Sequence, residues 1–420
     1  MWVTNSIIGD LHMHLFGKPS NGFWMDALLN DFVRRKEHQL VIITTGRNRG
    51  TIEVEKELVK YYMLPGGYPI EYNNLVPHNK HLWKQIIDKE KPDLIQVWGS
   101  EFKHGLCALQ AAPQIPSVIY MQGILAAIAR YYEAGIDRKE LRKCITLLDI
   151  IKRDSILQQK KKYYRKAAYE RELFDRAGNV IGENMWCKVH CEAISPNVKV
   201  HFCPLSINEV FANSNYDINK TEPHTLMCNA ADYPLKGLHI LLRALALVKR
   251  KYPDIRLYVP GTPLVVNKDF KSQIRKRGYF NYIEKLIKEL GLSDNVIFTS
   301  PLTPALMAER MVKVNAFVVC SALENHSSTL KEAMMVGLPC ISSYVGGVPE
   351  YVKHGENGML YRFEEYELLA EYICNIFGDK EFAMRIGKAA RETAIKIHDS
   401  ADIYDKIISV YENILGGAKA

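Results

Sequence analysis

The clearest candidates for chemistry in this sequence are two glutamates eight positions apart, Glu324 and Glu332. Glu324 lies in a polar loop that follows an apolar strand predicted at 316–320, and the loop ends in Ser-Ser-Thr, from Ser327 to Thr329. A helix that begins at this run leaves backbone N–H groups unsatisfied, and its dipole favours an anion, so the run predicts a phosphate site. Glu332 lies about one turn into that helix. The two carboxylates can then accept hydrogen bonds from sugar hydroxyls on either side of the phosphate.

Glu332 also has a purely structural interpretation. Thr329-Leu-Lys-Glu332 fits a capping box, in which the glutamate only satisfies the start of the helix. Two glutamates at this spacing would also arise by chance about once in a chain of this size. The residues that follow favour the functional interpretation. They form three glycine-containing loops, which read Gly337-Leu-Pro, Gly346-Gly347-Val-Pro-Glu350 and His354-Gly-x-x-Gly358.

A lysine at a helix start is the second candidate. Lys236 and Gly237 follow Tyr233-Pro-Leu, and the apolar spacing predicts a helix over 236–252. An exposed lysine at a helix N-terminus is electrostatically disfavoured, because the helix dipole already places positive charge there. The position therefore favours a functional role for the ammonium group over a solvated surface lysine.

Short apolar strands alternate with helices along the chain. Continuous apolar strands between helices indicate parallel sheets that are covered on both faces, so the sequence predicts two doubly wound α/β domains. The boundary is expected near Pro204 to Pro223, in a stretch rich in Asn and Ser. The strands are expected at 2–8, 40–45, 94–98, 117–121, 180–182, 199–203, 225–229, 255–260, 295–299, 316–320 and 338–343. The later helices are expected at 236–252, 281–290, 328–337, 364–378, 381–397 and 400–415.

The composition is that of an ordinary globular protein. A chain of 420 residues suggests two or three domains, and its 47% hydrophobic and 24% charged residues exclude disorder, collagen and coiled coil. No apolar run reaches the ~18 residues that a membrane span needs, and the N-terminus lacks the pattern of a signal peptide. Nine scattered cysteines argue for reduced thiols, and so for a cytoplasmic location.

Positive charge is concentrated in two segments. Residues 138–176 contain thirteen Lys and Arg against six Asp and Glu, and residues 268–288 contain seven against two, while the whole chain carries +8. The first segment is predicted to be helical, and tyrosines flank it. It is therefore expected to face an anionic membrane surface, with a solvated helix face as the alternative. The charge is well short of that of a histone-like chain, and no nucleic-acid partner is expected.

A metal-dependent hydrolase is a competing hypothesis. Asp10-Leu-His12-Met-His14 follows the first predicted strand and imitates the metal-binding entry of phosphoesterases and amidohydrolases. Such a site needs further His and Asp at later strand ends, but those strands end in glycines, and His104 is the nearest imidazole.

Two other patterns are weaker still. Cys187, His190 and Cys191 lie on one helical turn, but they lack the paired C-x2-C spacing of a zinc site, so buried thiols are the better interpretation. No G-x-G-x-x-G follows the first strand, which disfavours a dinucleotide-binding oxidoreductase.

Taken together, the strand, loop and helix around Glu324 and Glu332 and the glycine loops after them resemble the nucleotide-diphosphosugar site of retaining GT-B glycosyltransferases of family 4, with its E-x7-E signature. The resemblance covers essentially the whole chain and implies an α/β GT-B fold, two Rossmann-like doubly wound parallel-sheet domains facing a central cleft. Residues 1–205 would form an N-terminal acceptor-binding domain and residues 206–399 a C-terminal donor-binding domain. The last helix, about 400–420, is expected to pack back on the N-terminal domain.

The resemblance also implies roles for single residues. Family members carry Lys-Gly at a helix start after the first strand of the C-terminal domain, where the ammonium group neutralises the donor diphosphate. Glu332 would hold the ribose hydroxyls and Glu324 the transferred sugar. The implied catalytic residues are Glu324, Lys236 and Gln122. The implied donor-binding residues are Gly22, Lys236, Gly237, Glu324, Asn325, His326, Ser327, Ser328, Thr329 and Glu332.

The sequence departs from the family pattern at three positions. Many relatives carry an Arg where Ala231 stands, and many carry a His where Gln122 stands. The segment around Gln122 is instead similar to that of members from bacterial capsule and exopolysaccharide clusters. His326 replaces an apolar residue or proline. It is expected either to hydrogen-bond the donor sugar or to be a solvent-facing loop histidine.

The implied activity is transfer of a sugar from a nucleotide-diphosphate sugar to a glycan or a polyprenyl- or other lipid-linked acceptor. The family implies retention at the anomeric carbon, no metal ion and no cofactor, and the subgroup implies bacterial surface polysaccharide biosynthesis. We expect a cytoplasmic protein, peripheral on the inner face of the cell membrane. A nonenzymatic nucleotide-sugar-binding protein remains an alternative because of Ala231 and Gln122.

Overall fold

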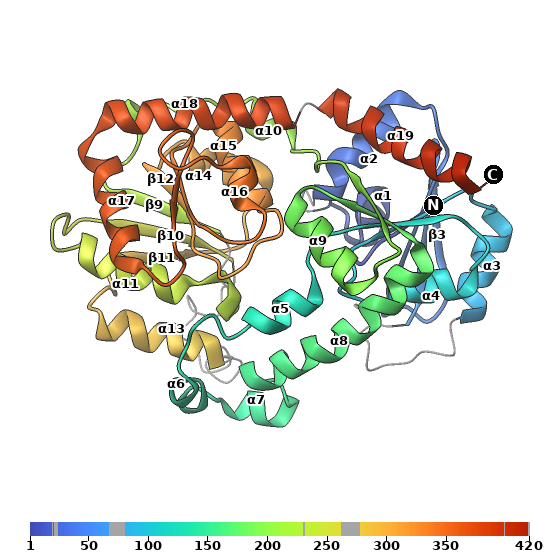
Figure 1. Cartoon of the computed structure of the whole chain (residues 1–420), viewed down its shortest axis with the longest axis horizontal. Coiled ribbons are helices and arrows are strands. Elements are labelled where there is room, and N and C mark those ends of the chain that lie inside the picture. The colour runs from blue at the N-terminus through green and yellow to red at the C-terminus, as the bar shows by residue number, and fades with distance from the viewer. Residues whose placement is uncertain are drawn as a thin grey trace. The chain divides into compact units, whose positions relative to one another are not determined.

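The computed structural model of the chain describes residues 1–18, 20, 24–66, 80–229, 232–261, 278–398 and 400–418. The chain forms two compact units, coloured along the sequence in Figure 1. Unit 1 comprises Met1–Ala126, Tyr164–Ser206 and His398–Ala420, and unit 2 comprises Ala127–Tyr163 and Ile207–Ile397. Each unit is built around one largely parallel sheet, which confirms the predicted fold class. None of the helices in the described ranges has the length and apolar character that crossing a bilayer requires.

Unit 1 is built on an eight-stranded sheet with the order β3-β4-β2-β1-β5-β6-β7-β8. All neighbours are parallel except β3 and β4, which pair antiparallel at one edge. The strands are β1 (Trp2–Val3), β2 (Leu40–Gly46), β3 (Ile52–Lys56), β4 (Val59–Pro65), β5 (Ile95–Trp98), β6 (Ser117–Tyr120), β7 (Asn179–Gly182) and β8 (Lys199–Phe202). The helices are α1 (Gly9–Phe16), α2 (Trp24–Arg35), α3 (Lys80–Glu90), α4 (His104–Ala111), α9 (Met185–Ile194) and α19 (Ser400–Ala418), together with α5 (Leu125–Tyr131) and α8 (Ile156–Ala177), which continue from one unit into the other.

The core of unit 1 is aromatic. Trp2 and Trp98 meet edge to face with ring centroids 5.1 Å apart, and Trp98 stacks on Tyr120 at 4.8 Å. The last helix, α19, packs against α2, and its Tyr404 ring meets Phe32 at 5.0 Å. Residues nearly four hundred positions apart therefore share one core, which holds the C-terminal helix in unit 1.

Unit 2 is built on a six-stranded, fully parallel sheet with the order β11-β10-β9-β12-β13-β14. Its strands are β9 (Thr225–Cys228), β10 (Arg256–Pro260), β11 (Val296–Thr299), β12 (Ala316–Val319), β13 (Cys340–Ser343) and β14 (Met359–Tyr361). Its helices are α6 (Arg138–Lys143), α7 (Leu147–Lys152), α10 (Glu209–Ala212), η2 (Ile218–Lys220), η3 (Pro234–Lys236), α11 (Leu238–Val248), α13 (Gly278–Glu289), α14 (Pro304–Met311), α15 (Ser328–Val336), α16 (Val348–Tyr351), α17 (Tyr366–Gly378) and α18 (Lys380–Ile397). Strands β9 and β12 are neighbours at the centre of the sheet. Successive strands β10 and β11 are added on the β9 side, and β13 and β14 are added on the β12 side. Doubly wound sheets bind ligands at the carboxyl ends of the two strands where the order reverses, which here are β9 and β12.

The structure differs from the sequence prediction in three places. The first strand, expected at 2–8, ends at Val3, and α1 begins at Gly9. Strands β3, β4 and β14 were not predicted; β3 reads Ile-Glu-Val-Glu-Lys and lacks a continuous apolar run because it is an edge strand. Residues 127–163 belong to unit 2, although the prediction places them in the N-terminal domain; Leu141, Cys144 and Ile156 are buried in the unit 2 core.

Candidate functional site

The candidate site lies at the carboxyl ends of β9 and β12 in unit 2. The loop after β9 carries Asn229 and turns through η3 into α11, so that Lys236 ends η3. The loop after β12 leads into α15. Because β9 and β12 are neighbouring parallel strands, these two loops meet, and the backbone N–H of Ala322 donates to the carbonyl of Leu235 over 2.7 Å.

An ion pair joins the two loops. Nζ of Lys236 donates to Oε1 of Glu324 over 2.7 Å, and the two side chains are 24% and 8% exposed. Ser321 Oγ and Asn229 Nδ2 donate to the same oxygen over 2.5 and 3.5 Å. Burial works against the charged ammonium group, but the adjacent Glu324 carboxylate outweighs it and raises the pKa of Lys236. Lys236 is therefore held charged and fixed in position, unlike a solvated surface lysine.

Two glycines allow the backbone of this site to pack closely. Gly237 has φ 70°, and a Cβ atom placed on it would lie 1.7 Å from the carbonyl oxygen of Cys320. Gly346 has φ 53°, and a Cβ atom there would lie 1.7 Å from the carbonyl oxygen of Glu324. That same oxygen accepts a hydrogen bond from Gly347 N over 3.1 Å. Any other residue at 237 or 346 would push the loops apart.

The first turn of α15 offers backbone donors to an anion. Ser327 is the N-cap residue, and its side chain makes no capping hydrogen bond. Ser328 and Thr329 occupy the first two helical positions and are partly exposed. Uncapped N–H groups at a helix start, with the positive end of the dipole behind them, are the groups that the predicted phosphate site requires.

Glu332 is the fifth residue of α15, counted from Ser328. A capping box needs the glutamate at the third helical position, which Leu330 occupies, so the capping-box interpretation is wrong. In the described part of the chain, no residue makes a hydrogen bond or ion pair with the Glu332 side chain, and burial raises its pKa to about 7. The carboxyl group is partly exposed, so it remains available to a ligand.

The two residues after Glu324 are buried. Asn325 is 6% exposed and His326 is 9% exposed. The alternative of a solvent-facing loop histidine is therefore wrong. In the sequence, His326 stands between Glu324 and the N-cap residue of α15, Ser327.

Unit 1 carries a second group of polar side chains at the carboxyl ends of its strands. Gly99 directly follows β5 and has φ 76°, and a Cβ atom on it would lie 2.1 Å from Oε2 of Glu101 and 3.0 Å from Nε2 of Gln122. Oε1 of Glu101 accepts a hydrogen bond from Gly123 N over 3.0 Å. Burial raises the pKa of Glu101 to about 7. The structure thus places Gln122 beside a carboxyl group that the sequence did not single out.

A second buried carboxyl group, that of Glu170, lies near Glu101. Glu170 is fully buried and accepts hydrogen bonds from Ser100 Oγ over 2.6 Å and from Leu125 N over 3.0 Å. Burial raises its pKa to about 7, and the nearby Glu101 adds to this shift. Both oxygens of Glu170 accept hydrogen bonds from residues of its own unit, whereas Oε2 of Glu101 is buried with no hydrogen-bond partner among the described residues. Of the predicted site residues, Gly22 lies outside the described residues, as does Ala231.

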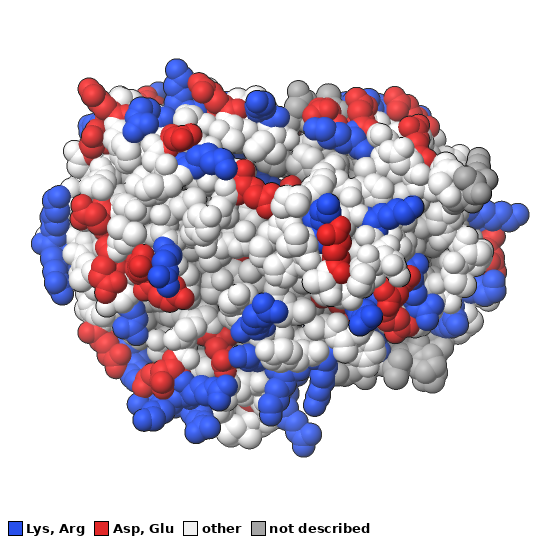
Figure 2. Space-filling view, in the orientation of Figure 1, with Lys and Arg blue, Asp and Glu red and all other residues white. Residues whose placement is uncertain are grey.

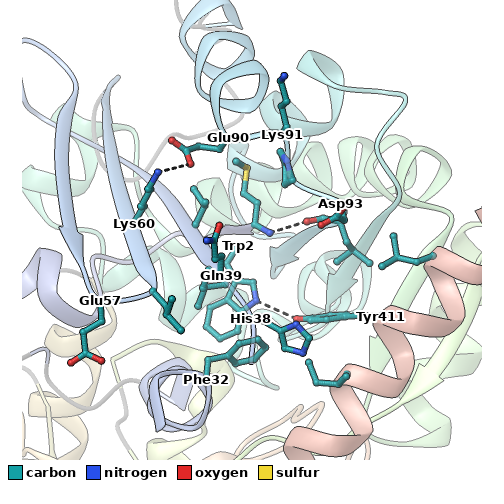
Figure 3. Close-up of a pocket in the computed structure, with 18 of the residues that line it drawn as sticks. Trp2, Phe32, His38, Gln39, Glu57, Lys60, Glu90, Lys91, Asp93 and Tyr411 are labelled. Atoms are coloured by element: carbon teal, nitrogen blue, oxygen red, sulfur yellow. Dashed lines mark hydrogen bonds and ion pairs between the residues drawn. The ribbon is translucent and has the colours of Figure 1, made fainter. Parts of the chain in front are cut away.

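A cavity of about 390 Å³ in unit 1 lies at the other end of the sheet (Figure 3). Trp2, Leu40 and Leu94 border it at or just before the amino ends of β1, β2 and β5, and Tyr411 of α19 closes one side. Ligand sites of doubly wound sheets lie at the carboxyl ends, so this cavity is separate from the candidate site.

The hydrolase motif does not form a metal site. Asp10, His12 and His14 lie on α1 rather than on a strand end, and Asp10 pairs with Lys56 at 2.8 Å. Successive i, i+2 residues of a helix point to different faces, so His12 and His14 cannot share one metal. Within the described residues, no three His, Cys, Asp or Glu side chains are grouped to hold an ion.

The buried-thiol interpretation of the cysteines on α9 is confirmed. Cys187 and Cys191 are fully buried, and their sulfur atoms lie 3.9 Å apart. Both side chains belong to the packing of α9 in unit 1 rather than to a metal site.

Comparison with solved structures identifies the class of fold. The chain is similar to a sucrose-phosphate synthase from Thermosynechococcus elongatus, with a TM-score of 0.70 at 18% identity over 93% of this chain and 92% of that one. It is also similar to Anabaena HepE, solved in complex with UDP-glucose, with a TM-score of 0.63 at 18% identity over 94% and 97% of the two chains. These likenesses establish the GT-B fold.

Sequence comparison identifies the domain that carries the site. Residues 212–393 match the family described as glycosyl transferases group 1, so unit 2 contains a domain of that family. The chain is 32% identical to N-acetyl-alpha-D-glucosaminyl L-malate synthase of Bacillus anthracis over 135 residues, which is 32% of this chain and 34% of that protein. It is 27% identical to spore coat protein SA of Bacillus subtilis over 180 residues, 42% of this chain and 46% of that protein. The matches therefore span about a third to a half of these curated relatives.

Proposed function

We propose that this chain is a glycosyltransferase that moves a sugar from a nucleotide-diphosphate sugar to a hydroxyl-bearing acceptor. The observation that carries the proposal is the Lys236–Glu324 ion pair, which lies beside the uncapped start of α15 and is followed by the unpartnered Glu332 carboxyl. A diphosphate needs cationic and N–H donors, and sugar hydroxyls need carboxylate acceptors. The candidate site holds both kinds of group, and it lies within the glycosyl transferases group 1 domain.

The proposed chemistry is stabilisation of the leaving diphosphate. As the bond between the sugar and the diphosphate breaks, negative charge grows on the phosphate oxygens. In the proposed complex, Lys236 and the N–H groups of Ser328 and Thr329 would meet that charge, and such fixed donors are usually the largest contribution to catalysis. Glu324 would hold the transferred sugar and Glu332 the ribose hydroxyls.

We further propose retention at the anomeric carbon and catalysis without a metal ion. A lysine and a helix start can supply the positive charge that a divalent cation supplies elsewhere. With retention, attack comes from the face that the diphosphate leaves, and a phosphate oxygen can accept the proton of the acceptor hydroxyl. The residues near Gln122, including Glu101 with its buried oxygen, support an acceptor site in unit 1.

We propose a lipid-linked or glycan acceptor in bacterial surface polysaccharide biosynthesis, with a cytoplasmic enzyme that is peripheral to the membrane. The basis is the resemblance of the region around Gln122 to members from polysaccharide gene clusters. UDP-sugars are the first donors to examine, because HepE is solved with UDP-glucose.

The test is a binding and turnover screen with UDP-glucose, UDP-galactose, UDP-N-acetylglucosamine and GDP-mannose, each with and without EDTA. We expect one nucleotide sugar to raise the melting temperature and to release its nucleoside diphosphate at a rate that EDTA does not change. Lys236→Ala should abolish both effects, and Lys388→Ala, which removes an exposed lysine of α18, should change neither. Binding without turnover in the presence of acceptor extract would favour the nonenzymatic alternative, and no binding at all would refute the proposal.

A further inference from the structure

One short helix of unit 2 exposes its apolar side chains. In α7, Leu147 is 71% exposed, Ile150 63% and Ile151 71%. Positions i, i+3 and i+4 lie on one face of a helix, so the three side chains form a single aliphatic surface, here named the α7 patch. Soluble domains usually turn such a face toward the core.

The orientation of the α7 patch is fixed by the rest of the helix. Thr146 and Asp149 form a capping box, with Thr146 N donating to Asp149 Oδ2 over 2.9 Å and Asp149 N donating to Thr146 Oγ1 over 3.2 Å. Asp149 is 2% exposed, so this face of α7 is turned inward. Cys144 and Ile156, on either side of α7, are buried in the unit 2 core. The opposite face, which carries the patch, is therefore held outward.

Positive side chains surround the α7 patch. Segment 137–163 contains nine Lys and Arg against four Asp and Glu. Figure 2 shows blue side chains on both sides of white ones along the lower edge of the molecule, where Figure 1 places α6 and α7. Five exposed or partly exposed cations in the segment have no acidic partner among the described residues: Lys139, Arg142, Lys152, Arg153 and Lys161.

The four acidic residues of the segment already have partners. Asp137 is the N-cap residue of α6 and accepts a hydrogen bond from Lys139 N. Glu140 pairs with Lys143 at 2.7 Å and with Lys285 at 3.1 Å. Asp154 pairs with Lys162 at 2.7 Å, and Asp149 is buried in its capping box. Among the described residues, these acidic side chains therefore leave the five cations named above without a partner.

The second half of the predicted basic segment has a different environment. On α8, Arg171 pairs with Asp175 at 3.8 Å and Arg176 pairs with Glu172 at 3.0 Å. The free positive charge of segment 138–176 is therefore concentrated toward its first half, around α6 and α7.

We propose that α6 and α7 dock on an anionic bilayer surface, with the α7 patch inserted at the boundary between headgroups and acyl chains and the surrounding Lys and Arg at the headgroups. Aliphatic side chains on one face and cations beside them are the pattern of interfacial membrane helices. Interfaces with proteins instead favour aromatic residues and are depleted in lysine. A helix of six residues is also far smaller than the ~800 Å² per partner of a stable protein interface. This inference rests on the proposed membrane-peripheral location and names the surface that binds, while its test measures vesicle binding alone and so can fail without the proposed glycosyl transfer failing.

The cations and the aliphatic side chains of the α7 patch are both needed for appreciable binding to the vesicles. Each Lys or Arg close to an anionic leaflet raises the affinity about fivefold, and this gain falls with salt. The transfer of three aliphatic side chains out of water adds a contribution to the affinity that salt does not weaken. Removal of either part is expected to lower the partition coefficient at least about tenfold.

The experiment is co-sedimentation of the full chain with two kinds of vesicle, phosphatidylcholine alone and equal parts of phosphatidylcholine and phosphatidylglycerol. The apolar variant carries Leu147→Ser, Ile150→Ser and Ile151→Ser. Its control carries Leu306→Ser and Ile395→Ser, which remove aliphatic side chains that are 49% exposed elsewhere on unit 2. The charge variant carries Arg142→Gln, Lys152→Gln and Lys161→Gln. All changed residues are exposed, so melting temperatures should match that of the parent chain.

We expect the parent and the control to bind the anionic vesicles, and both test variants to bind at least about tenfold more weakly. Added salt should weaken the parent strongly and the charge variant little. Equal binding of parent and apolar variant, or no parent binding to anionic vesicles at low salt, would overturn the proposal. A parent that is dimeric in solution and becomes monomeric in the apolar variant would overturn it in favour of a second copy as the occupant.

Discussion

Replacing Glu332 by glutamine preserves the shape of the side chain and removes its ability to ionise. Burial raises the pKa of this carboxyl from 4.5 to about 7. The folded protein therefore binds the proton more tightly than the unfolded chain does, and stability falls as the pH rises from about 4.5 through about 7. Glu332→Gln removes this loss, so the variant should be the more stable protein above pH 7.

The size of the effect follows from the same pKa. A change from 4.5 to about 7 corresponds to at most ~3 kcal/mol of unfolding free energy, and the partial exposure of the side chain reduces this to on the order of 1 kcal/mol. For a unit of this size, the variant should melt about 2–4 °C above the parent at pH 8. The difference should shrink toward pH 5, where the parent carboxyl is protonated.

Donor binding should change in the opposite direction. In the proposed complex, Glu332 accepts hydrogen bonds from two ribose hydroxyls, whereas glutamine offers a single acceptor oxygen. The loss of this charge-assisted pair should weaken UDP-glucose binding by ~1.5–3 kcal/mol, about ten- to a hundredfold, at pH 8. In the parent, the affinity should fall as the pH drops through about 7, because the carboxylate becomes protonated. The affinity of the variant should not depend on pH over this range.

Calorimetric titration between pH 6 and pH 8 and thermal unfolding without ligand measure the two effects separately. Glu371→Gln is the matched control, because Glu371 is an exposed glutamate inside α17 of the same unit. It should change neither the affinity nor the melting temperature. Equal donor affinity of Glu332→Gln and parent at pH 8 would refute the ribose contact. An unchanged melting temperature at pH 8 would refute the burial of the carboxyl group.

Three further predictions concern two loop residues of unit 2, Lys236 and Gly346, and Glu101 of unit 1. Lys236→Ala should lower the unfolding free energy by about 1–3 kcal/mol in urea, because Glu324 is left buried without its cation, and Glu324→Gln in the same chain should restore most of it. Gly346→Ala should cost more than ~3 kcal/mol and abolish donor binding, since the added Cβ would meet the Glu324 carbonyl. Gly355→Ala is its control: φ is also positive there (77°), but nothing lies within 4 Å of the added Cβ, and the cost should be about 1 kcal/mol. Glu101→Gln should stabilise the protein increasingly as the pH rises from 5 to 8, because burial raises the pKa of Glu101 to about 7; a constant difference in melting temperature across that range would contradict this.

Much of the fold is predictable because fully buried strands have a distinctive sequence. The runs around 316–320 and 117–121 are continuously apolar, as both faces of each strand are covered. The edge strand β3 alternates charged and apolar residues, so it lacks that pattern. The prediction put Asp10 directly after the first strand, but that strand ends at Val3 and Asp10 lies in α1. The length of β1 depends on its pairing with β2 and β5, which the local sequence does not specify.

The site was predictable only in part. The spacing of Glu324 and Glu332 and the uncapped helix start are local features that the sequence carries. The bond between Lys236 and Glu324 joins residues 88 positions apart and depends on the pairing of β9 with β12, which no local pattern specifies. Glu101 was missed because a glutamate in a loop is ordinarily solvated. Its burial arises only when Gly123 and Gln122 are brought beside it by β6.

The Lys236–Glu324 ion pair also bears on which ligands the proposed donor site should bind. A simple anion such as inorganic phosphate that draws Lys236 away leaves Glu324 only 8% exposed and without its cation, and offers that carboxylate few donors in return. A molecule that carries a diphosphate and a hydroxylated ring compensates both partners at once. Breaking the Lys236–Glu324 ion pair is thus favourable only for a ligand that carries the diphosphate and the hydroxylated ring in one molecule. An intact nucleotide sugar should therefore bind more tightly than the affinities of its separate fragments predict.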